Sequence, residues 1–293
     1  MTSTITRRMI LSAPLMLGAT SIHARAEQPF GLQSLERRRG GRLGFFALDT
    51  GSGQTMGYRA DEKFIMCSTF KGILAAQILS RVDAGKEKLD RQIPYSEKDL
   101  IFTSPVTKAN VSSGSLSVEI LCRAIVQVSD NTAAILLMRS GGGPAGLTQF
   151  VRSLGDYVTR SDRYEPEANN YNGQMDTTTP RAIAGLARKI LLGTALTNSS
   201  RDLLLKWMTE SKTGNARLKA AFPAGWITAD KTGTSLARET NDYLMVTPPG
   251  RAPLFVSAYY DAENLSLDER ESVLREAGQI FVRWTVQDSQ RRE

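Results

Sequence analysis

The chain has 293 residues, 41% of them hydrophobic, and a formal net charge of +7 that is spread along the sequence. Its single histidine, His23, lies in an N-terminal stretch typical of a removable export signal, so the exported protein would contain none. A Ser-His-Asp hydrolase and zinc sites built on histidine are therefore excluded, and the mild, unclustered charge gives no indication of nucleic-acid binding.

Residues 1–26 have the pattern of an export signal. Arg7 and Arg8 form a basic start, residues 10–20 are apolar, and Ala24-Arg25-Ala26 offers a small-x-small cleavage site. The paired arginines suggest the twin-arginine route of a bacterium, although an ordinary secretory signal can also carry two arginines. No apolar stretch is long enough to span a membrane, so we expect an exported, periplasmic protein with no membrane insertion after signal removal.

The remaining residues, 27–293, have strand patterns at both ends and helical patterns between them. Strands are predicted at 43–50 and 54–58, joined by a Gly-Ser-Gly turn, and again at 226–234, 243–247 and 254–260. Helical patterns fill most of 68–208, and a last helix opens with the capping box Ser266-x-x-Glu269. We therefore predict an α/β fold of the α+β type. An antiparallel sheet with N- and C-terminal helices (27–64 and 209–293) would be interrupted by an all-helical subdomain (65–208).

The first long helical segment contains a lysine in unusual surroundings. Ser68-Thr69-Phe70-Lys71 precedes an almost wholly apolar run in which Lys71 is the only charge before Arg81. A buried ammonium is costly unless it is paired or neutral, so a helix that only filled a core would not need one. The spacing places Ser68 and Lys71 on one helix face, where a lysine with a shifted pKa can act as a base toward the serine. Ser68 could alternatively cap the helix.

Three more polar motifs follow in order along the chain. They are Ser129-Asp130-Asn131, Glu165-Pro166-Glu167-Ala168-Asn169 and Lys231-Thr232-Gly233-Thr234. Taken singly, the first could cap the next helix, the second could be a solvated acidic loop, and the third is a common strand-to-turn sequence. Together with the Ser68 motif, the series resembles that of the class A serine β-lactamases, and the resemblance covers essentially the whole mature chain. It implies a β-lactamase/transpeptidase-like fold.

The resemblance implies a catalytic role for five residues. Ser68 would be the acylated nucleophile and Lys71 its neighbouring base, while Ser129 would pass a proton to the lactam nitrogen. Glu165 and Asn169 would hold and activate the water that hydrolyses the acyl-enzyme. Whether Lys71 or Glu165, acting through water, takes the Ser68 proton stays open.

Five further residues would bind the substrate. Asn131 would contact the acylamino side chain, and Lys231 and Thr232 would bind the substrate carboxylate. Gly233 would let a ligand approach the backbone closely, and the Thr234 N–H would form an oxyanion hole with the Ser68 N–H.

An arginine expected near the carboxylate site is absent, because Thr240 occupies its usual position. Arg217 resembles the substitute used by another branch of the family, although it could also be an exposed helix arginine. Arg238 is a further alternative for the same role.

Other departures concern the rim of the site. Thr103 stands where an aromatic often guards the entrance, and residues 170–175 form a loop about two residues shorter than usual. Cys67 is similar to a cysteine of carbapenem-hydrolysing members, but Ser235 occupies the expected position of its partner. Cys67 and Cys122, the only cysteines, could form a bridge or remain buried free thiols; we favour the latter.

We therefore expect a monomeric, exported class A β-lactamase that hydrolyses penicillins and cephalosporins, confers β-lactam resistance, and uses no metal or organic cofactor. The rivals are a D-alanyl-D-alanine peptidase and a sensor that traps the drug covalently. Both should lack a carboxylate such as Glu165 for deacylation.

Overall fold

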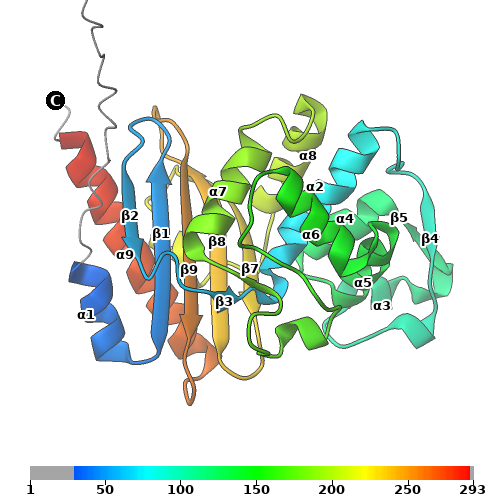
Figure 1. Cartoon of the computed structure of the whole chain (residues 1–293), viewed down its shortest axis with the longest axis horizontal. Helices are drawn as coiled ribbons and strands as arrows, with labels where there is room; N and C mark the ends of the chain where they lie inside the picture. The colour runs from blue at the N-terminus through cyan, green and yellow to red at the C-terminus, as the bar shows by residue number, and fades with distance from the viewer. Residues whose placement is uncertain (1–29, 291–293) are drawn as a thin grey trace, which may run out of the picture.

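The computed structural model describes residues 30–290, and the expected export signal lies outside this range. A five-stranded antiparallel sheet has the order β2-β1-β9-β8-β7 (Figure 1). Its strands are β1 (Arg42–Asp49), β2 (Thr55–Tyr58), β7 (Ile227–Thr234), β8 (Glu239–Thr247) and β9 (Leu254–Asp261). Strand β1 pairs with β9 along its whole length, from Arg42 opposite Asp261 to Asp49 opposite Leu254.

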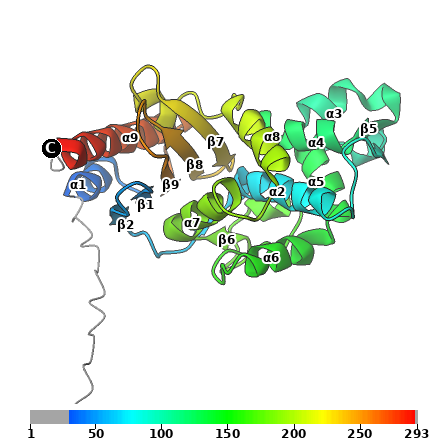
Figure 2. The same cartoon turned by 90° about the horizontal axis from the view of Figure 1, so that it is seen from above.

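Alternation along β1 directs its apolar side chains to both faces of the sheet. Leu43, Phe45 and Ala47 join a core cluster with α1 (Phe30–Arg39) and α9 (Leu267–Gln290), whereas Phe46 joins the cluster on the opposite face. In Figure 2, α1 and α9 lie together on one side of the sheet and α7 (Pro180–Leu191) lies on the other. The capping box before α9 is confirmed, because the Ser266 N–H donates to Glu269 Oε2 over 2.8 Å.

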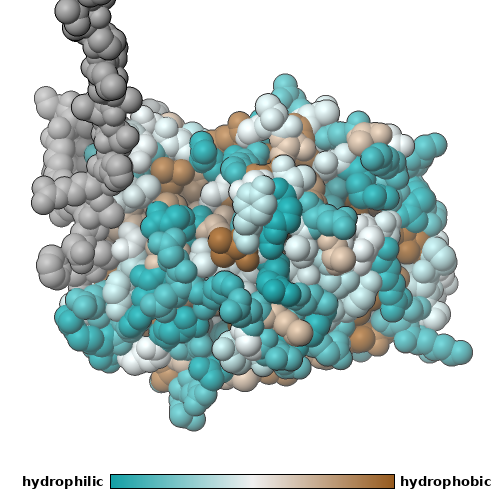
Figure 3. Space-filling view, in the orientation of Figure 1, coloured by the Kyte–Doolittle hydropathy of each residue, from teal (hydrophilic) through white to brown (hydrophobic). Residues whose placement is uncertain are grey.

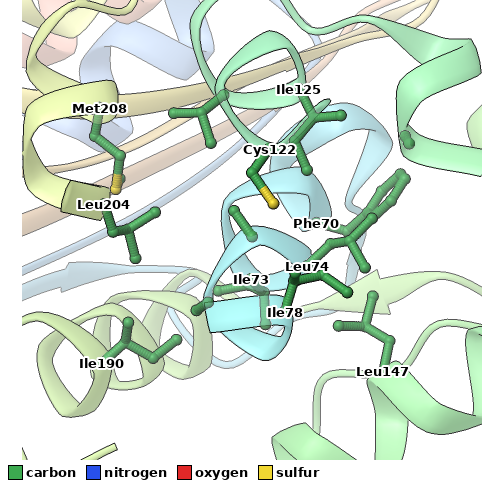
Figure 4. Packing of buried hydrophobic residues seen from close by; sticks show 14 of the residues in the cluster. Phe70, Ile73, Leu74, Ile78, Cys122, Ile125, Leu147, Ile190, Leu204 and Met208 are labelled. Carbon is green, nitrogen blue, oxygen red and sulfur yellow. The ribbon is translucent and has the colours of Figure 1, made fainter. Parts of the chain in front are cut away.

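The second half of the molecule is mainly helical and surrounds α2 (Phe70–Asp83). Its other helices are α3 (Pro105–Ala109), α4 (Val118–Gln127), α5 (Asn131–Ser140), α6 (Gly143–Ser153) and α8 (Asn198–Thr209). Figure 4 shows Ile73 and Leu74 of α2 among apolar side chains of α4, α6, α7 and α8. Burial of α2 on nearly all sides explains its uniformly apolar sequence.

The predicted fold class is confirmed, with two local differences. Short ladders pair β4 (Gln92–Pro94) with β5 (Ser115–Ser117), and β3 (Phe64–Ile65) with β6 (Thr177–Thr178), so the helical half also contains strand pairs. Strand β8 begins at Glu239, four residues before the predicted start. The division into subdomains at 64/65 and 208/209 stays a prediction.

None of the helices within residues 30–290 combines the length and apolarity needed to cross a bilayer. On the face drawn in Figure 3, apolar residues form small separate patches between hydrophilic ones.

Candidate active site

Ser68 lies in a tight turn where the two halves of the molecule meet. It belongs to the short 3-10 helix η1 (Cys67–Thr69), which follows β3 and leads into α2. Cys67 has a φ of 46°, a left-handed conformation that a non-glycine residue adopts only when its surroundings hold it. Thr69, not Ser68, occupies the N-cap position of α2, and it makes no side-chain cap. Ser68 instead lines a cavity of about 660 Å³, so the capping alternative is wrong.

The Lys71 ammonium is fully buried and lies at the centre of the site. Nζ donates to Ser68 Oγ over 2.9 Å and to the Ser129 carbonyl over 2.9 Å, and it forms an ion pair of 3.2 Å with Glu165 Oε1. It also donates to Asn131 Oδ1. Burial lowers the pKa of Lys71, and the charge of Glu165 partly opposes that effect. A lysine with a lowered pKa can act as a base toward the adjacent hydroxyl.

Ser129 lies between two lysines. Its Oγ accepts from Lys71 Nζ and from Lys231 Nζ, each over 3.3 Å. Lys231 is also fully buried, and desolvation together with the charge of Lys71 lowers its pKa to about 7. The Ser129 hydroxyl is thus connected to the Ser68 side and to the β7 side of the cavity.

The Ser129-Asp130-Asn131 motif both caps a helix and contributes side chains to the cavity. Asp130 caps α5 by accepting from the Ala133 N–H over 2.9 Å, so the capping interpretation is correct for this residue. Ser129 and Asn131, by contrast, both line the cavity. Asn131 is oriented by its Nδ2, which donates to the Phe102 carbonyl over 3.0 Å.

The Glu165 side chain is buried, whereas a solvated acidic loop would leave it exposed. It is 4% exposed, it accepts from Ser68 Oγ over 3.4 Å, and it accepts from Asn169 Nδ2. The ion pair between Arg163 Nε and Asp176 Oδ2, at 2.7 Å, closes the base of the loop. The interpretation as a solvated loop is correct for the exposed Glu167 but wrong for Glu165.

Gly233 gives β7 room to pack against the nucleophile turn. A Cβ added to Gly233 would lie 2.5 Å from the Met66 carbonyl oxygen and 3.1 Å from the Thr69 nitrogen. The sequence predicts that Gly233 leaves this space for a ligand, whereas in the structure the turn that contains Met66 and Thr69 occupies it. Thr232 and Thr234, on either side of Gly233, line the cavity.

Arg217 is buried and crosses the end of the β7–β8 ladder. It is 3% exposed; Nη1 donates to the carbonyls of Gly233 (3.0 Å) and Asn241 (2.8 Å), and Nη2 donates to Thr234 Oγ1 (2.6 Å). Nε forms an ion pair of 3.0 Å with Glu271 Oε1. The alternative of an exposed helix arginine is therefore wrong.

Arg238 does not line the cavity. Its side chain forms ion pairs with Asp261 and Glu263, where β8 begins and β9 ends. Of the two candidate arginines, Arg217 is the one placed at the site.

Several residues of the cavity wall carried no signal in the sequence. They are Phe102, Thr213, Leu236, Ala237, Leu267 and Glu271. Phe102, 53% exposed, provides an aromatic one residue before the expected position, Thr103. Thr213 is connected to the site because Thr232 Oγ1 donates to its Oγ1 over 2.6 Å. No local pattern marks such residues, since tertiary packing alone brings them to the cavity.

The cysteine next to the nucleophile is a free, buried thiol, as is Cys122. Burial raises the pKa of the Cys67 thiol well above its ordinary value. Ser235, at the expected position of a partner cysteine, instead donates its hydroxyl to Glu239. The preference for free thiols over a bridge is confirmed.

Comparisons with known proteins agree with this geometry. The model of the Beta-lactamase enzyme family matches residues 31–285. The chain is 42% identical to Carbapenem-hydrolyzing beta-lactamase KPC of Klebsiella oxytoca, over 94% of this chain and 95% of that one. It is 39% identical to Beta-lactamase SME-1 of Serratia marcescens, over 94% and 96%. A crystal structure of a beta lactamase from Burkholderia vietnamiensis, 64% identical, superposes with a TM-score of 0.88 over 90% of this chain and 98% of that one.

Proposed function

The chain belongs to the class A β-lactamases and hydrolyses β-lactams, and we propose that it does so through an acyl-enzyme on Ser68 that Glu165 helps to hydrolyse. The observation that carries this proposal is the position of the Ser68 hydroxyl between two basic groups. Lys71 Nζ lies 2.9 Å from it and Glu165 Oε1 lies 3.4 Å from it. No histidine is needed to activate the serine in this arrangement.

In the acylation step, Ser68 Oγ attacks the lactam carbonyl and its proton passes to the Lys71–Glu165 pair. The new bond is the ester between Oγ and the carbonyl carbon, and the bond that breaks is the amide to the ring nitrogen. Ser129 protonates that nitrogen; its contacts with both lysines provide a route by which its proton is replaced. The backbone N–H groups of Ser68 and Thr234 stabilise the negative charge on the carbonyl oxygen.

Deacylation requires a water that is both held and deprotonated. Asn169 Nδ2 donates to Glu165, and Asn169 Oδ1 is a buried acceptor with no hydrogen-bond partner among the described residues. A water that donates to this oxygen would lie beside the Glu165 carboxylate, which can accept its second proton. The water oxygen then attacks the ester, and the Ser68 alkoxide leaves and recovers a proton.

Substrate recognition is assigned to four further side chains at the site. Thr232 and Arg217 of the cavity wall, with the buried Lys231 bonded to Ser129 Oγ, bind the substrate carboxylate, and Asn131 binds the acylamino group. We propose penicillins and cephalosporins as substrates. A relative is described as carbapenem-hydrolysing, but Cys67 has no cysteine partner here, and turnover of a carbapenem must be measured.

The test is the mass of the intact protein at successive times after mixing with a penicillin. The native enzyme should show a transient adduct and release of opened product, whereas Ser68→Ala should show no adduct. A lasting adduct on the native enzyme would instead indicate a peptidase or a covalent sensor. The buried Glu165 favours the lactamase over both of these rivals.

We further propose export to the periplasm by the twin-arginine route and a monomeric enzyme without metal or nucleic-acid partners. Replacing Arg7 and Arg8 by lysine should retain the protein in the cytoplasm; unchanged periplasmic yield would indicate the general secretory route. Light scattering of the purified mature enzyme tests the oligomeric state.

A further inference from the structure

Asn241 lies behind the active site and does not line the cavity. It is located on β8, opposite Gly233 of β7 and Tyr259 of β9, and it is 1% exposed. A carboxamide in the interior must be hydrogen-bonded to offset its desolvation, so its partners indicate its function.

The side chain of Asn241 is bonded to the segment that leads into the nucleophile. Nδ2 donates to the Ile65 carbonyl over 2.9 Å and to the Met66 carbonyl over 3.2 Å. These residues immediately precede Cys67, whose φ of 46° must be held by its surroundings, and Ser68 follows.

The backbone of Asn241 is bonded to the opposite side of the site. Its carbonyl accepts from Arg217 Nη1 over 2.8 Å, and the same nitrogen donates to the Gly233 carbonyl over 3.0 Å. In the β7–β8 ladder, Asn241 faces Gly233 and the preceding Thr240 faces Thr234.

The proposed oxyanion hole has one donor on each of these two segments. The Ser68 N–H belongs to η1, whereas the Thr234 N–H belongs to the end of β7, and no covalent connection fixes their separation. Oxyanion donors act only when they are held at hydrogen-bond distance from the developing charge. We propose that Asn241 is a positioning residue that sets the separation between the Ser68 and Thr234 amides. The inference rests on the acyl-enzyme mechanism proposed above.

Other contacts hold the same turn, and they limit the expected effect. Thr69 Oγ1 is bonded to the Met66 carbonyl (2.8 Å) and lies 3.0 Å from Tyr259 Oη, and the Met66 N–H donates to the Asp176 carbonyl (2.8 Å). Loss of the Asn241 amide should therefore loosen the turn without unfolding it. Removing an oxyanion donor outright typically costs about 10²- to 10³-fold in rate, so misplacing one should cost roughly 10- to 100-fold.

The variant is Asn241→Ala, and Gln77→Ala is its matched control. Gln77 is also a buried carboxamide, 5% exposed; its Nε2 donates over 3.0 Å to the carbonyl of Gly141, which follows α5, and neither residue lines the cavity. Both variants lose an amide-to-carbonyl bond, but only Asn241→Ala should lower kcat/KM by the roughly 10- to 100-fold expected for a misplaced donor.

A second readout reports on the oxyanion hole itself. In a Glu165→Gln background that accumulates the acyl-enzyme, infrared spectroscopy measures the ester carbonyl stretch, which rises when hydrogen bonds to the oxygen weaken. Asn241→Ala should raise this frequency and Gln77→Ala should leave it unchanged. If Asn241→Ala does not fold, Asn241→Ser, which cannot reach both carbonyls, takes its place.

An Asn241 variant with kcat/KM within about twofold of the native value and an unshifted carbonyl frequency would overturn the inference. Failure of Glu165→Gln to accumulate any adduct would instead count against the mechanism. The comparison of kcat/KM between Asn241→Ala and Gln77→Ala, each in the enzyme with native Glu165, would then still test whether Asn241 positions the turn.

Discussion

Replacing Glu165 by glutamine removes one negative charge from the site and preserves the shape of the side chain. Acylation should be affected little, because Lys71 Nζ remains 2.9 Å from Ser68 Oγ, closer than Glu165 Oε1 at 3.4 Å. Deacylation should be affected strongly, because Glu165 is the carboxylate bonded to Asn169, where the hydrolytic water is proposed to bind. Loss of a positioned general base costs about 10²- to 10⁴-fold, or roughly 3–5 kcal/mol of transition-state stabilisation.

Stopped-flow hydrolysis of a penicillin, combined with intact-protein mass, measures both steps. Glu165→Gln should open the ring of close to one equivalent of penicillin in a burst, hold the opened drug as the ester on Ser68, and remain almost fully acylated. Turnover of this variant at the native rate would refute the reasoning and would leave Glu165 as a structural partner of Lys71 only.

The same variant should change the pH dependence of acylation. The charge of Glu165 raises the pKa of Lys71 against the larger lowering effect of burial, so its removal lowers that pKa further. Lysine acts as a base only in its neutral form, which predominates above its pKa. The acid limb of the burst rate should therefore move to lower pH in Glu165→Gln, and an upward shift would contradict the assignment of Lys71.

Three other outcomes are expected. Arg217→Ala should lower kcat/KM about tenfold or more, because it removes a charge-assisted contact with the substrate carboxylate. Arg238→Ala changes a residue outside the cavity and should have native kinetics. Equal effects of the two substitutions would argue against binding of the substrate carboxylate by Arg217. Because the pKa of Lys231 is about 7, KM should rise as pH increases above 7, and Lys231→Arg, which keeps its charge, should flatten this dependence. Chelators should leave turnover unchanged, since the mature sequence has no histidine; activity lost in EDTA and restored by zinc would contradict this.

The sequence predicted best those elements that follow a simple hydrophobic period. The predicted strand at 254–260 became β9, Leu254–Asp261, because nearly all of its residues are buried and apolar or aromatic. The start of β8 was missed because its first four residues, Glu239 to Asp242, are polar and yet buried. Strand prediction from sequence assumes that polar residues are exposed and apolar residues are buried. The residues beneath the site are polar and buried, so this assumption fails there.

The motifs likewise predicted the centre of the site better than its walls. The spacing of Ser68 and Lys71 was sufficient to place their side chains in contact, since one turn of helical chain connects them. The pairing of Arg217 with Glu271 was not predictable, because it depends on how α9 packs against the short 3-10 helix η5 (Leu218–Ala221). Asn241 was missed for the same reason, since its partners precede it by most of the chain.

The pairing of β1 with β9 also determines when during synthesis the enzyme can become active. Strand β1, near the start of the chain, pairs with β9, near its end. The five-stranded sheet therefore cannot be completed until almost all of the protein has been translated (Figure 1). Such long-range pairing is slow to form. A stop codon just before β9 would preserve every catalytic motif, but β8 would lose its pairing with β9. The β7–β8 hairpin, which carries the Thr234 N–H, would then be separated from the rest of the sheet. Resistance can therefore be lost through late truncations that change no catalytic residue.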